Sequence, residues 1–317
     1  MKLPFPNPSA TTQRRQADTA RGFTLTELLF VIGMTALLAT VLLSASFTTQ
    51  ERVLRAECAS NLKQIGSATL IYAGENNDFV PIRSWHNPPP VGIGNPWQTY
   101  EVCRINGIGS RSIVEGPYGL GLLFFGKEVT DPKIFYCPSI KNGLFGLFAY
   151  DTYNEAGWPW PSIPPDFTDA NPYVRSSYNY YAQPKATETI SDGTYGVVTM
   201  PVLAAQNIVL TSPYPGDPPQ SVASYPARLK TSDVDPTKAV ACDVLQNMSN
   251  LSHKIAGQPG GVNALFGDGH VNWTPVRGNN KKGSLQPFDP RLWDPFTGVP
   301  IGNSPTAFRI IMNGLVP

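Results

Sequence analysis

The carboxyl-terminal third of the chain contains the side chains best suited to metal or acid–base chemistry, which are Asp243, His253, Asp268 and His270. Aspartate and histidine together bind divalent metals or transfer protons. A simpler interpretation is favoured, because Asp268 is followed by glycine and Asp-Gly is a preferred hairpin turn between two alternating strands. The remaining ligand hypothesis is calcium bound by Asp243, Asp268 and loop carbonyl oxygens, since Ca²⁺ prefers several oxygen ligands.

Few other features of the sequence indicate catalysis. The chain has three histidines and contains no GxSxG, HExxH or GxxxxGKS/T motif. We therefore expect no enzymatic activity. A membrane-tethered metal-dependent enzyme is the least favoured alternative, and it would require the four side chains above to converge. The net charge is +1, and no cluster of lysines and arginines offers a phosphate-binding face, which predicts no nucleic-acid partner.

Four cysteines could form disulfides or remain free: Cys58, Cys103, Cys137 and Cys242. They form no CxxC pair, which makes a zinc knuckle a weak interpretation. If the domain lies outside the cytoplasm, disulfides are allowed, and four cysteines permit three connectivities. Four buried free thiols are the alternative, because free cysteine is often buried.

The amino-terminal end combines a basic leader with a long apolar run. Residues 1–22 hold four basic residues and one acidic residue, and residues 28–47 hold no charge. Twenty helical residues span about 30 Å, the thickness of the hydrocarbon core of a bilayer. By the positive-inside rule, the leader stays in the cytoplasm and the bulk of the chain is exported.

A single acid, Glu27, stands at the edge of this apolar run. An ordinary secretory signal or an uncleaved anchor would explain the run but not the acid, because a charge in a bilayer costs about 2.5 kcal/mol or more. Cleavage between Gly22 and Phe23 would create a charged amine on Phe23, close to Glu27 of a neighbouring copy. A position of Glu27 in the headgroup layer is the alternative.

The distribution of proline predicts a long helix. The chain has 32 prolines but none between Pro8 and Pro81, and proline breaks helix interiors. Gly74 and Asn76-Asn77 then supply a stop signal. An amphipathic second half is indicated by side chains that recur at steps of three or four, namely Leu54, Cys58, Leu62, Ile65, Thr69 and Tyr72. About fifty helical residues would reach ~75 Å.

The rest of the chain is expected to form short strands between long loops. The β-rich runs bounded by turn residues are Ile134–Cys137, Ser177–Tyr181, Asn207–Thr211, Ala239–Leu245, Val262–Phe266 and His270–Thr274. Segments rich in proline and aromatic residues are expected to be surface loops, at 86–97, 157–173 and 212–226. An antiparallel sheet packed on one long helix is an α+β fold.

The residues around Gly22 carry a resemblance to a known family. The run RGFTLTELL at 21–29 resembles the type III signal of prepilins, in which a basic leader and a small residue precede Phe-Thr-Leu-x-Glu and an apolar helix. The resemblance implies that a prepilin peptidase cuts between Gly22 and Phe23 and methylates the Phe23 amine. It also implies that Glu27 guides the subunit into a helical filament. The chain departs from many pilins at Ser44, where a helix-loosening proline is common.

The head resembles a group of large pilin-like proteins with a carboxyl-terminal DGHV-type signature. The segments that carry this resemblance are CASNLKQIGSATLIYAGENNDFVP, DPKIFYCPS, SSYNYY and GVNALFGDGHVNW. Cys58 and Cys137 fall in these segments, so they are the disulfide pair that the resemblance favours, which leaves Cys103 and Cys242 to pair with each other.

The resemblance also bears on the acid and histidine residues of the head. Some pseudopilins bind calcium there, in line with the calcium hypothesis for Asp243 and Asp268. His253 precedes Asp268 by fifteen residues, a wider spacing than this group usually has.

The expected precursor has a pilin-like α+β fold in four parts: a cleaved leader (1–22), a transmembrane helical half (23–47), an amphipathic helical half (48–75) and a β-rich globular head (76–317). We expect a single-pass protein of the bacterial inner membrane, with its amino terminus in the cytoplasm and its head in the periplasm or outside the cell. Its expected function is that of a structural subunit of a type IV pilus-like or type II secretion pseudopilus filament. The expected partners are prepilin peptidase, further copies and other pilin-like subunits.

A minor tip subunit or adhesin is the alternative function, with a glycan or protein ligand bound by aromatic loops. The tryptophans that motivate it are Trp85, Trp97, Trp158, Trp160 and Trp273. The simpler explanation is that these rings cover a thin sheet core.

Overall fold

The computed structural model of the chain describes residues 23–82, 99–104, 116–141, 143, 145–147, 173–203, 205–210, 220–255, 257–276, 285–293 and 305–317. Within these ranges, the side chains of residues 40–48, 173, 205–210, 220–226 and 305 lie outside the description. The chain divides into two compact units, an N-terminal unit of residues 1–47 and a head unit of residues 48–317, and each is described by itself.

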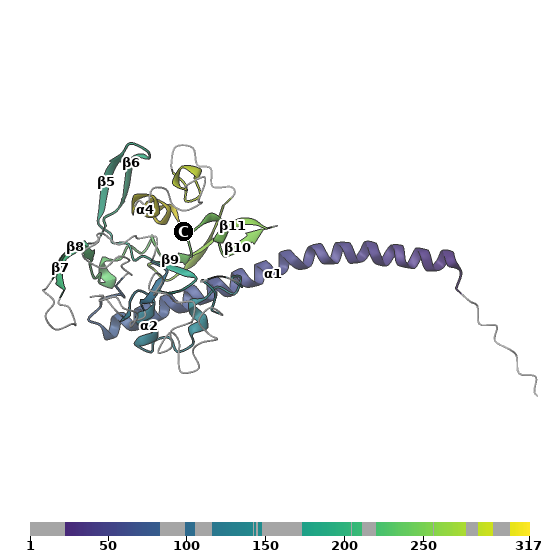
Figure 1. Ribbon diagram of the computed structural model, residues 1–317, viewed down its shortest axis with the longest axis horizontal. Helices are drawn as coiled ribbons and strands as arrows, with labels where there is room; N and C mark the ends of the chain where they lie inside the picture. Colours follow the sequence, from purple (N-terminus) through teal and green to yellow (C-terminus); the bar gives the residue numbers. More distant parts are fainter. Residues whose placement is uncertain are drawn as a thin grey trace, which may run out of the picture. The chain divides into compact units, whose positions relative to one another are not determined.

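The predicted long helix is confirmed, since α1 extends over Leu25–Glu75 (Figure 1). The stop signal ends it where expected. Asn77 and Asp78 adopt φ angles of 55° and 68°, in the left-handed region that terminates helices. The N–H of Asp78 donates to the carbonyl oxygen of Ala73 at 2.8 Å, which closes the last turn.

In the head unit, α1 presents one apolar face to the sheet. The side chains on this face are buried at helical spacing, namely Cys58, Leu62, Ile65, Ala68 and Tyr72. Leu70 and Ile71, which lie between two of them in sequence, are exposed. This arrangement confirms the predicted amphipathic segment, which packing rather than helix propensity stabilises.

The rest of the described chain consists of short strands and short helical segments. The strands are β1 (Glu101–Arg104), β2 (Gly116–Pro117), β3 (Tyr173–Arg175), β4 (Tyr178–Tyr180), β5 (Thr187–Asp192), β6 (Gly196–Pro201), β7 (Ala205–Leu210), β8 (Gln220–Pro226), β9 (Ala239–Asp243), β10 (His253–Ile255), β11 (Gln258–Phe266) and β12 (Val271–Pro275). The helical segments are α2 (Gly121–Phe125), α4 (Pro305–Gly314) and the 3₁₀ turns η2 (Pro132–Phe135), η3 (Thr231–Asp233), η4 (Met248–Asn250) and η5 (Pro290–Leu292). One long helix and antiparallel sheet confirm the predicted α+β class.

Within the described residues, the largest sheet has five strands, and β11 is its centre. β11 pairs β12 along one edge, while its other edge pairs first β10 and then β9, which in turn pairs β4. The pairs with β10 end at Gly261 and those with β9 begin at Ala264. Among the described strands, Val262 and Asn263 therefore face a gap on this edge, which lies between the end of β9 at Asp243 and the start of β10 at His253.

In the described part of the head unit, the buried side chains form two groups, one on each face of this sheet. In the first group, α1 packs with Tyr178 and Leu265. In the second group, α4 packs with Val262 and Ala264. Side chains alternate between the two faces along a strand, which is why the neighbours Ala264 and Leu265 belong to different groups.

Two details of the sequence prediction are wrong. Ile134–Cys137 is not a strand, because its first residues belong to η2. The side chain of Asp131 caps this turn by accepting the N–H of Lys133 at 3.0 Å, and a proline at the start favours the turn. The expected loop 212–226 contains strand β8, which pairs β7 in a hairpin. Helix α4 had no sequence prediction.

Candidate functional site

The first turn of α1 is a capping box formed by Thr24 and Glu27. The N–H of Thr24 donates to Oε2 of Glu27 at 2.9 Å, and the N–H of Glu27 donates to Oγ1 of Thr24 at 3.2 Å. The Thr24 hydroxyl also donates to the Glu27 carboxylate, at 2.8 Å. These bonds satisfy N–H groups that no helical carbonyl can reach. Glu27 therefore has a role within its own chain that was not predicted, although the spacing Thr-x-x-Glu is its signature.

From Leu28 onward, the first half of α1 is almost entirely apolar around the helix. Every side chain from Phe23 to Ala39 is exposed. The large apolar members are Phe23, Leu25, Leu28, Leu29, Phe30, Val31, Ile32, Met34, Leu37 and Leu38. Each such side chain gains about 1.5–3 kcal/mol on full removal from water. A helix with this surface requires an apolar environment, such as lipid or other helices.

Parts of the predicted amino-terminal region lie outside the described residues. These parts are the leader 1–22 with Gly22, and the side chains of residues 40–48 in the expected span. Across the described residues, no helix combines the length and the apolar character needed to cross a membrane.

In the head unit, four buried side chains with metal-binding groups meet at the gap in the sheet. We call them the Cys-Asp-His cluster: Cys58 from α1, Cys137 from the segment after η2, Asp243 from the end of β9 and His253 from the start of β10. Their ligand atoms all lie within 4.8 Å of one another, and each residue is at most 1% exposed. Among the residues that the structure describes, this is the group of donors fit for a metal ion.

The closest contacts of the cluster link each sulfur to the acid or the imidazole. Sγ of Cys58 is 3.0 Å from Oδ1 of Asp243. Nε2 of His253 is 3.6 Å from Sγ of Cys137 and 3.5 Å from Oδ2 of Asp243. The hydroxyl of Tyr178 approaches Sγ of Cys58 at 3.1 Å. All four donor atoms therefore face one small volume.

Asn263 occupies the gap in the sheet and positions two members of the cluster. Because no described strand takes its N–H on this edge, that N–H donates to Oδ2 of Asp243 at 2.6 Å. Its side-chain amide lies 3.2 Å from Nε2 of His253 and donates to the carbonyl oxygen of Arg55 at 3.3 Å. The partner strand of β11 thus changes from β10 to β9 at Asn263, and the gap between these two strands makes room for the side chains of Asp243 and His253.

The His253 ring is held from the side that faces away from the cluster. Its Nδ1 lies 2.7 Å from Oε1 of Glu51 and 3.1 Å from Oγ of Ser139. The ring also contacts Trp273 edge-on at 5.6 Å, and the guanidinium of Arg55 lies 4.5 Å from the centre of the Trp273 ring. A proton on Nδ1 that is donated to Glu51 leaves the lone pair of Nε2 directed into the cluster.

Burial favours the neutral forms of the cluster. Removal from water raises the pKa of Asp243 to about 7 and lowers the pKa of His253 to about 4. Burial also raises the pKa of the Cys58 thiol well above its usual range, and the neighbouring Cys137 and Asp243 add to this effect. The His253–Glu51 contact is therefore a hydrogen bond from a neutral imidazole at neutral pH. Buried polar groups of this kind are costly unless each has a partner.

The four side chains that the sequence analysis grouped together do not converge. Asp243 and His253 meet in the cluster, but Asp268 and His270 lie in the exposed turn after β11 and bond to each other. Gly269 has a φ of 89°, which confirms the predicted Asp-Gly hairpin turn. The convergence that the enzymatic alternative required is therefore not found.

The expected calcium pair is likewise not formed. Phe266, at the end of β11, is three positions along the strand from Asn263, which contacts Asp243. At about 3.3 Å per residue, the turn with Asp268 begins roughly 10 Å away. Asp243 has sulfurs and an imidazole beside it instead of the oxygen ligands that calcium prefers.

All four cysteines are described and buried, and all are free thiols. The structure brings Cys58 and Cys137, the predicted disulfide pair, into one cluster. Cys103 and Cys242 belong to different groups of buried side chains, and Sγ of Cys242 lies 3.5 Å from the Met312 sulfur. No spacing in the sequence predicts that the two cysteines join Asp243 and His253.

Most of the tryptophans that motivate the aromatic-loop hypothesis lie outside the described residues, namely Trp85, Trp97, Trp158 and Trp160. Trp273 is half-buried and packs between Arg55 and His253. It supports the cluster rather than forming an open platform.

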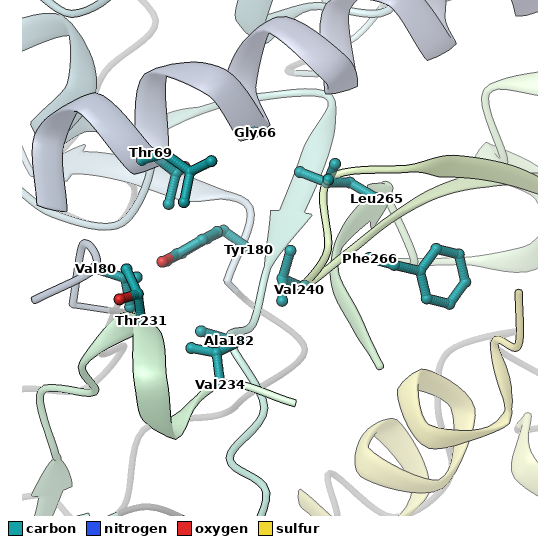
Figure 2. Close-up of a pocket in the computed structure, with 13 residues that line it drawn as sticks. Gly66, Thr69, Val80, Tyr180, Ala182, Thr231, Val234, Val240, Leu265 and Phe266 are labelled. Carbon is teal, nitrogen blue, oxygen red and sulfur yellow. The ribbon is translucent and has the colours of Figure 1, made fainter. Parts of the chain in front are cut away.

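A cavity of about 50 Å³ lies between α1 and the sheet (Figure 2). Figure 2 shows Thr69, Tyr180, Val240 and Leu265 among the side chains around it. Small-molecule pockets usually measure roughly 300–1,000 Å³, so this space is too small for a metabolite. It is a packing defect beside α1 rather than a binding site.

The chain was compared with known protein families, curated proteins and solved structures. No family model, no curated protein and no solved structure matches the chain.

Proposed function

We propose that the chain is a structural subunit of a type IV pilus-like or type II secretion pseudopilus filament, made as a precursor and assembled through the first half of α1. The observation that carries this proposal is the exposed and almost entirely apolar surface of α1 between Leu28 and Ala39. It directly follows the prepilin-like signal around Gly22 and Phe23. The second half of α1 supports the proposal, because its buried side chains pack in the core of a folded head.

In this proposal, the apolar run of residues 28–47 first anchors the precursor in the bacterial inner membrane. The amino terminus stays in the cytoplasm and the head is exported. A prepilin peptidase then cuts between Gly22 and Phe23 and methylates the new amine. In the filament, helices of neighbouring pilin-like subunits replace the lipid around the apolar run, and close helix packing holds the subunits together.

Glu27 has two tasks in this proposal, one in its own chain and one between chains. In its own chain it caps α1 through Thr24. After cleavage, Phe23 carries a positive amine, and a carboxylate enclosed by apolar helices requires such a partner. The pairing of Glu27 with the Phe23 amine of a neighbouring copy would therefore fix the axial position of each new subunit.

Three variants separate the two tasks. Glu27→Gln keeps a side chain that can cap the helix but removes the charge, since glutamine also serves in capping boxes. Glu27→Ala removes both cap and charge. Thr24→Ala weakens the cap and keeps the charge. The amount of each variant in membranes and in sheared filaments is measured by immunoblotting, in cells that carry the native assembly apparatus.

We expect Glu27→Gln and Glu27→Ala to accumulate in membranes and to be absent from filaments, whereas Thr24→Ala is incorporated. Normal incorporation of Glu27→Gln into filaments would contradict the charge-pairing role of Glu27. Loss of Thr24→Ala from filaments together with normal Glu27→Gln would assign Glu27 to helix capping alone.

A further inference from the structure

The Cys-Asp-His cluster has the donor set of a site for a thiophilic divalent cation. Two sulfurs, one imidazole nitrogen and one carboxylate oxygen converge from four separate segments. Thiolates and imidazole together select zinc and chemically similar ions rather than calcium or magnesium. The donors are buried together rather than spread over a surface, where acidic groups commonly gather without a ligand.

The spacing of the donor atoms is close to that of a tetrahedral ion. With zinc–sulfur bonds of about 2.3 Å and zinc–nitrogen or zinc–oxygen bonds of about 2.0–2.2 Å, the ligand atoms of a tetrahedral site lie about 3.3–3.8 Å apart. Sγ of Cys58 lies 3.0 Å from Oδ1 of Asp243, while Nε2 of His253 lies 3.5 Å from the other carboxylate oxygen, Oδ2, and 3.6 Å from Sγ of Cys137. The remaining separations stay within 4.8 Å. Small side-chain movements would therefore suffice to bind an ion.

The second nitrogen of His253 supplies an independent observation. Metal-binding histidines almost always donate their other N–H to a carboxylate, a carbonyl or water, which fixes the ring and its tautomer. Here Nδ1 lies 2.7 Å from Oε1 of Glu51. Nε2 consequently faces the cluster as an acceptor, and an ion would take the place of the Asn263 amide, 3.2 Å away, as its partner.

The surroundings of Cys58 fit a metal-bound thiolate as well. The Tyr178 hydroxyl is 3.1 Å from Sγ of Cys58 and can donate a hydrogen bond to a negatively charged sulfur. Asp243 is oriented by the N–H of Asn263, at 2.6 Å from Oδ2. Cys58 and Asp243 thus each have a hydrogen-bond partner outside the set of four ligands, as His253 does.

We propose that Cys58, Cys137, Asp243 and His253 bind one zinc ion, which fastens α1 to the sheet of the head. Four protein ligands fill a tetrahedral coordination shell and leave no position for a substrate, so the ion has a structural task. Because Cys58 and Asp243 are 185 residues apart in sequence, the ion would close a very long loop. The proposal does not depend on the filament role, since a monomer would bind zinc equally.

A disulfide between Cys58 and Cys137 is the competing outcome. It would use the two sulfurs alone and leave Asp243 and His253 buried without an ion between them. In the structure, Sγ of Cys137 lies 3.6 Å from Nε2 of His253, and Sγ of Cys58 contacts Asp243 and Tyr178. These contacts favour the ion.

The test measures zinc in the full chain, purified in detergent micelles with reductant and without chelator from cells grown with added zinc. Elemental mass spectrometry is expected to find one zinc ion per chain in the wild type and in Cys103→Ser, whose thiol is buried outside the cluster. Cys58→Ser and Cys137→Ser are expected to lose it. Zinc retained in both of these variants, or a wild type that stays metal-free after addition of Zn²⁺, would overturn the proposal.

Two further measurements keep the test decisive if a ligand variant fails to fold. Exchange of Co²⁺ into the wild type should give the intense visible bands of a tetrahedral ion and sulfur-to-cobalt charge transfer, whereas an octahedral spectrum without charge transfer would refute the site. Glu51→Gln should lower zinc affinity about 10- to 100-fold in competition with a chromophoric chelator. The control Glu57→Gln, at an exposed position of the same helix, should leave it unchanged. Equal affinities of the two variants would overturn the role of Glu51.

The oxidation state of the cysteines is read from protein isolated without reductant, with its thiols blocked at lysis. Peptide mapping should show no link between Cys58 and Cys137 in the zinc-bound protein. A Cys58–Cys137 disulfide in protein that holds no zinc would establish the competing outcome.

Discussion

The two halves of α1 carry their apolar side chains in different arrangements, although they belong to one helix. In residues 28–39, the side chains are almost all apolar, and they are exposed around the whole helix. In residues 58–72, buried side chains form one face, and the others are exposed or half-buried. The first pattern suits lipid or a bundle of like helices, whereas the second suits a single folded partner. The difference suggests that the head depends on the second half for stability, and that assembly depends on the first.

The largest difference between the two halves of α1 is expected when one leucine in each half is truncated. Leu62 is fully buried in the core, and Leu29 is exposed in the first half. Leu62→Ala should lower the free energy of unfolding of the head by about 2–5 kcal/mol, because it leaves a cavity in a packed core. Leu29→Ala should leave that free energy unchanged. Guanidinium unfolding of the chain in micelles, followed by tryptophan fluorescence, measures both.

Equal losses in the two variants would contradict the separation of tasks along α1. A small loss in Leu62→Ala alone would show that the core collapses around the shortened side chain. Two leucines make a matched pair because the removed groups are identical.

A smaller effect is expected from adding a methyl group to one glycine in each half. A Cβ on Gly66 would lie 3.0 Å from Cδ1 of Leu265, a flexible side chain beside the cavity of about 50 Å³. We expect Leu265 to move into this space, so that Gly66→Ala stabilises the head by about 0.3–1 kcal/mol through helix propensity. A Cβ on Gly33 meets no atom within 4 Å, and Gly33→Ala should not change the unfolding of the head.

The same unfolding assay decides this second comparison. A loss of stability in Gly66→Ala would mean that Leu265 cannot use the cavity. A gain in head stability from Gly33→Ala would contradict the independence of the two halves.

Much of the fold could be predicted because its signals are local. The absence of proline, the helical spacing around Leu62 and the stop at Asn76-Asn77 define α1. The turn at Asp268-Gly269 and the strands on either side follow from turn chemistry and alternation. The strand prediction for Ile134–Cys137 is wrong because the capped turn η2, which begins before this segment, outweighs its β-rich composition.

The Cys-Asp-His cluster could be predicted only in part. The sequence singled out Asp243 and His253 for metal chemistry and Cys58 with Cys137 as a pair, but assigned them to different sites. No spacing rule joins them, because they come from four segments, and the change of partner along β11 brings them together. The role of Glu51 had no sequence signal, since it depends on the distance from α1 to His253.

The measurement that tests the central claim most directly is mass spectrometry of the amino terminus of the protein isolated from membranes of its native host. The account predicts a mature chain that begins at Phe23 with one methyl group on its amine, after removal of residues 1–22. An intact leader, or a chain cut near Phe47, would contradict the proposed filament subunit.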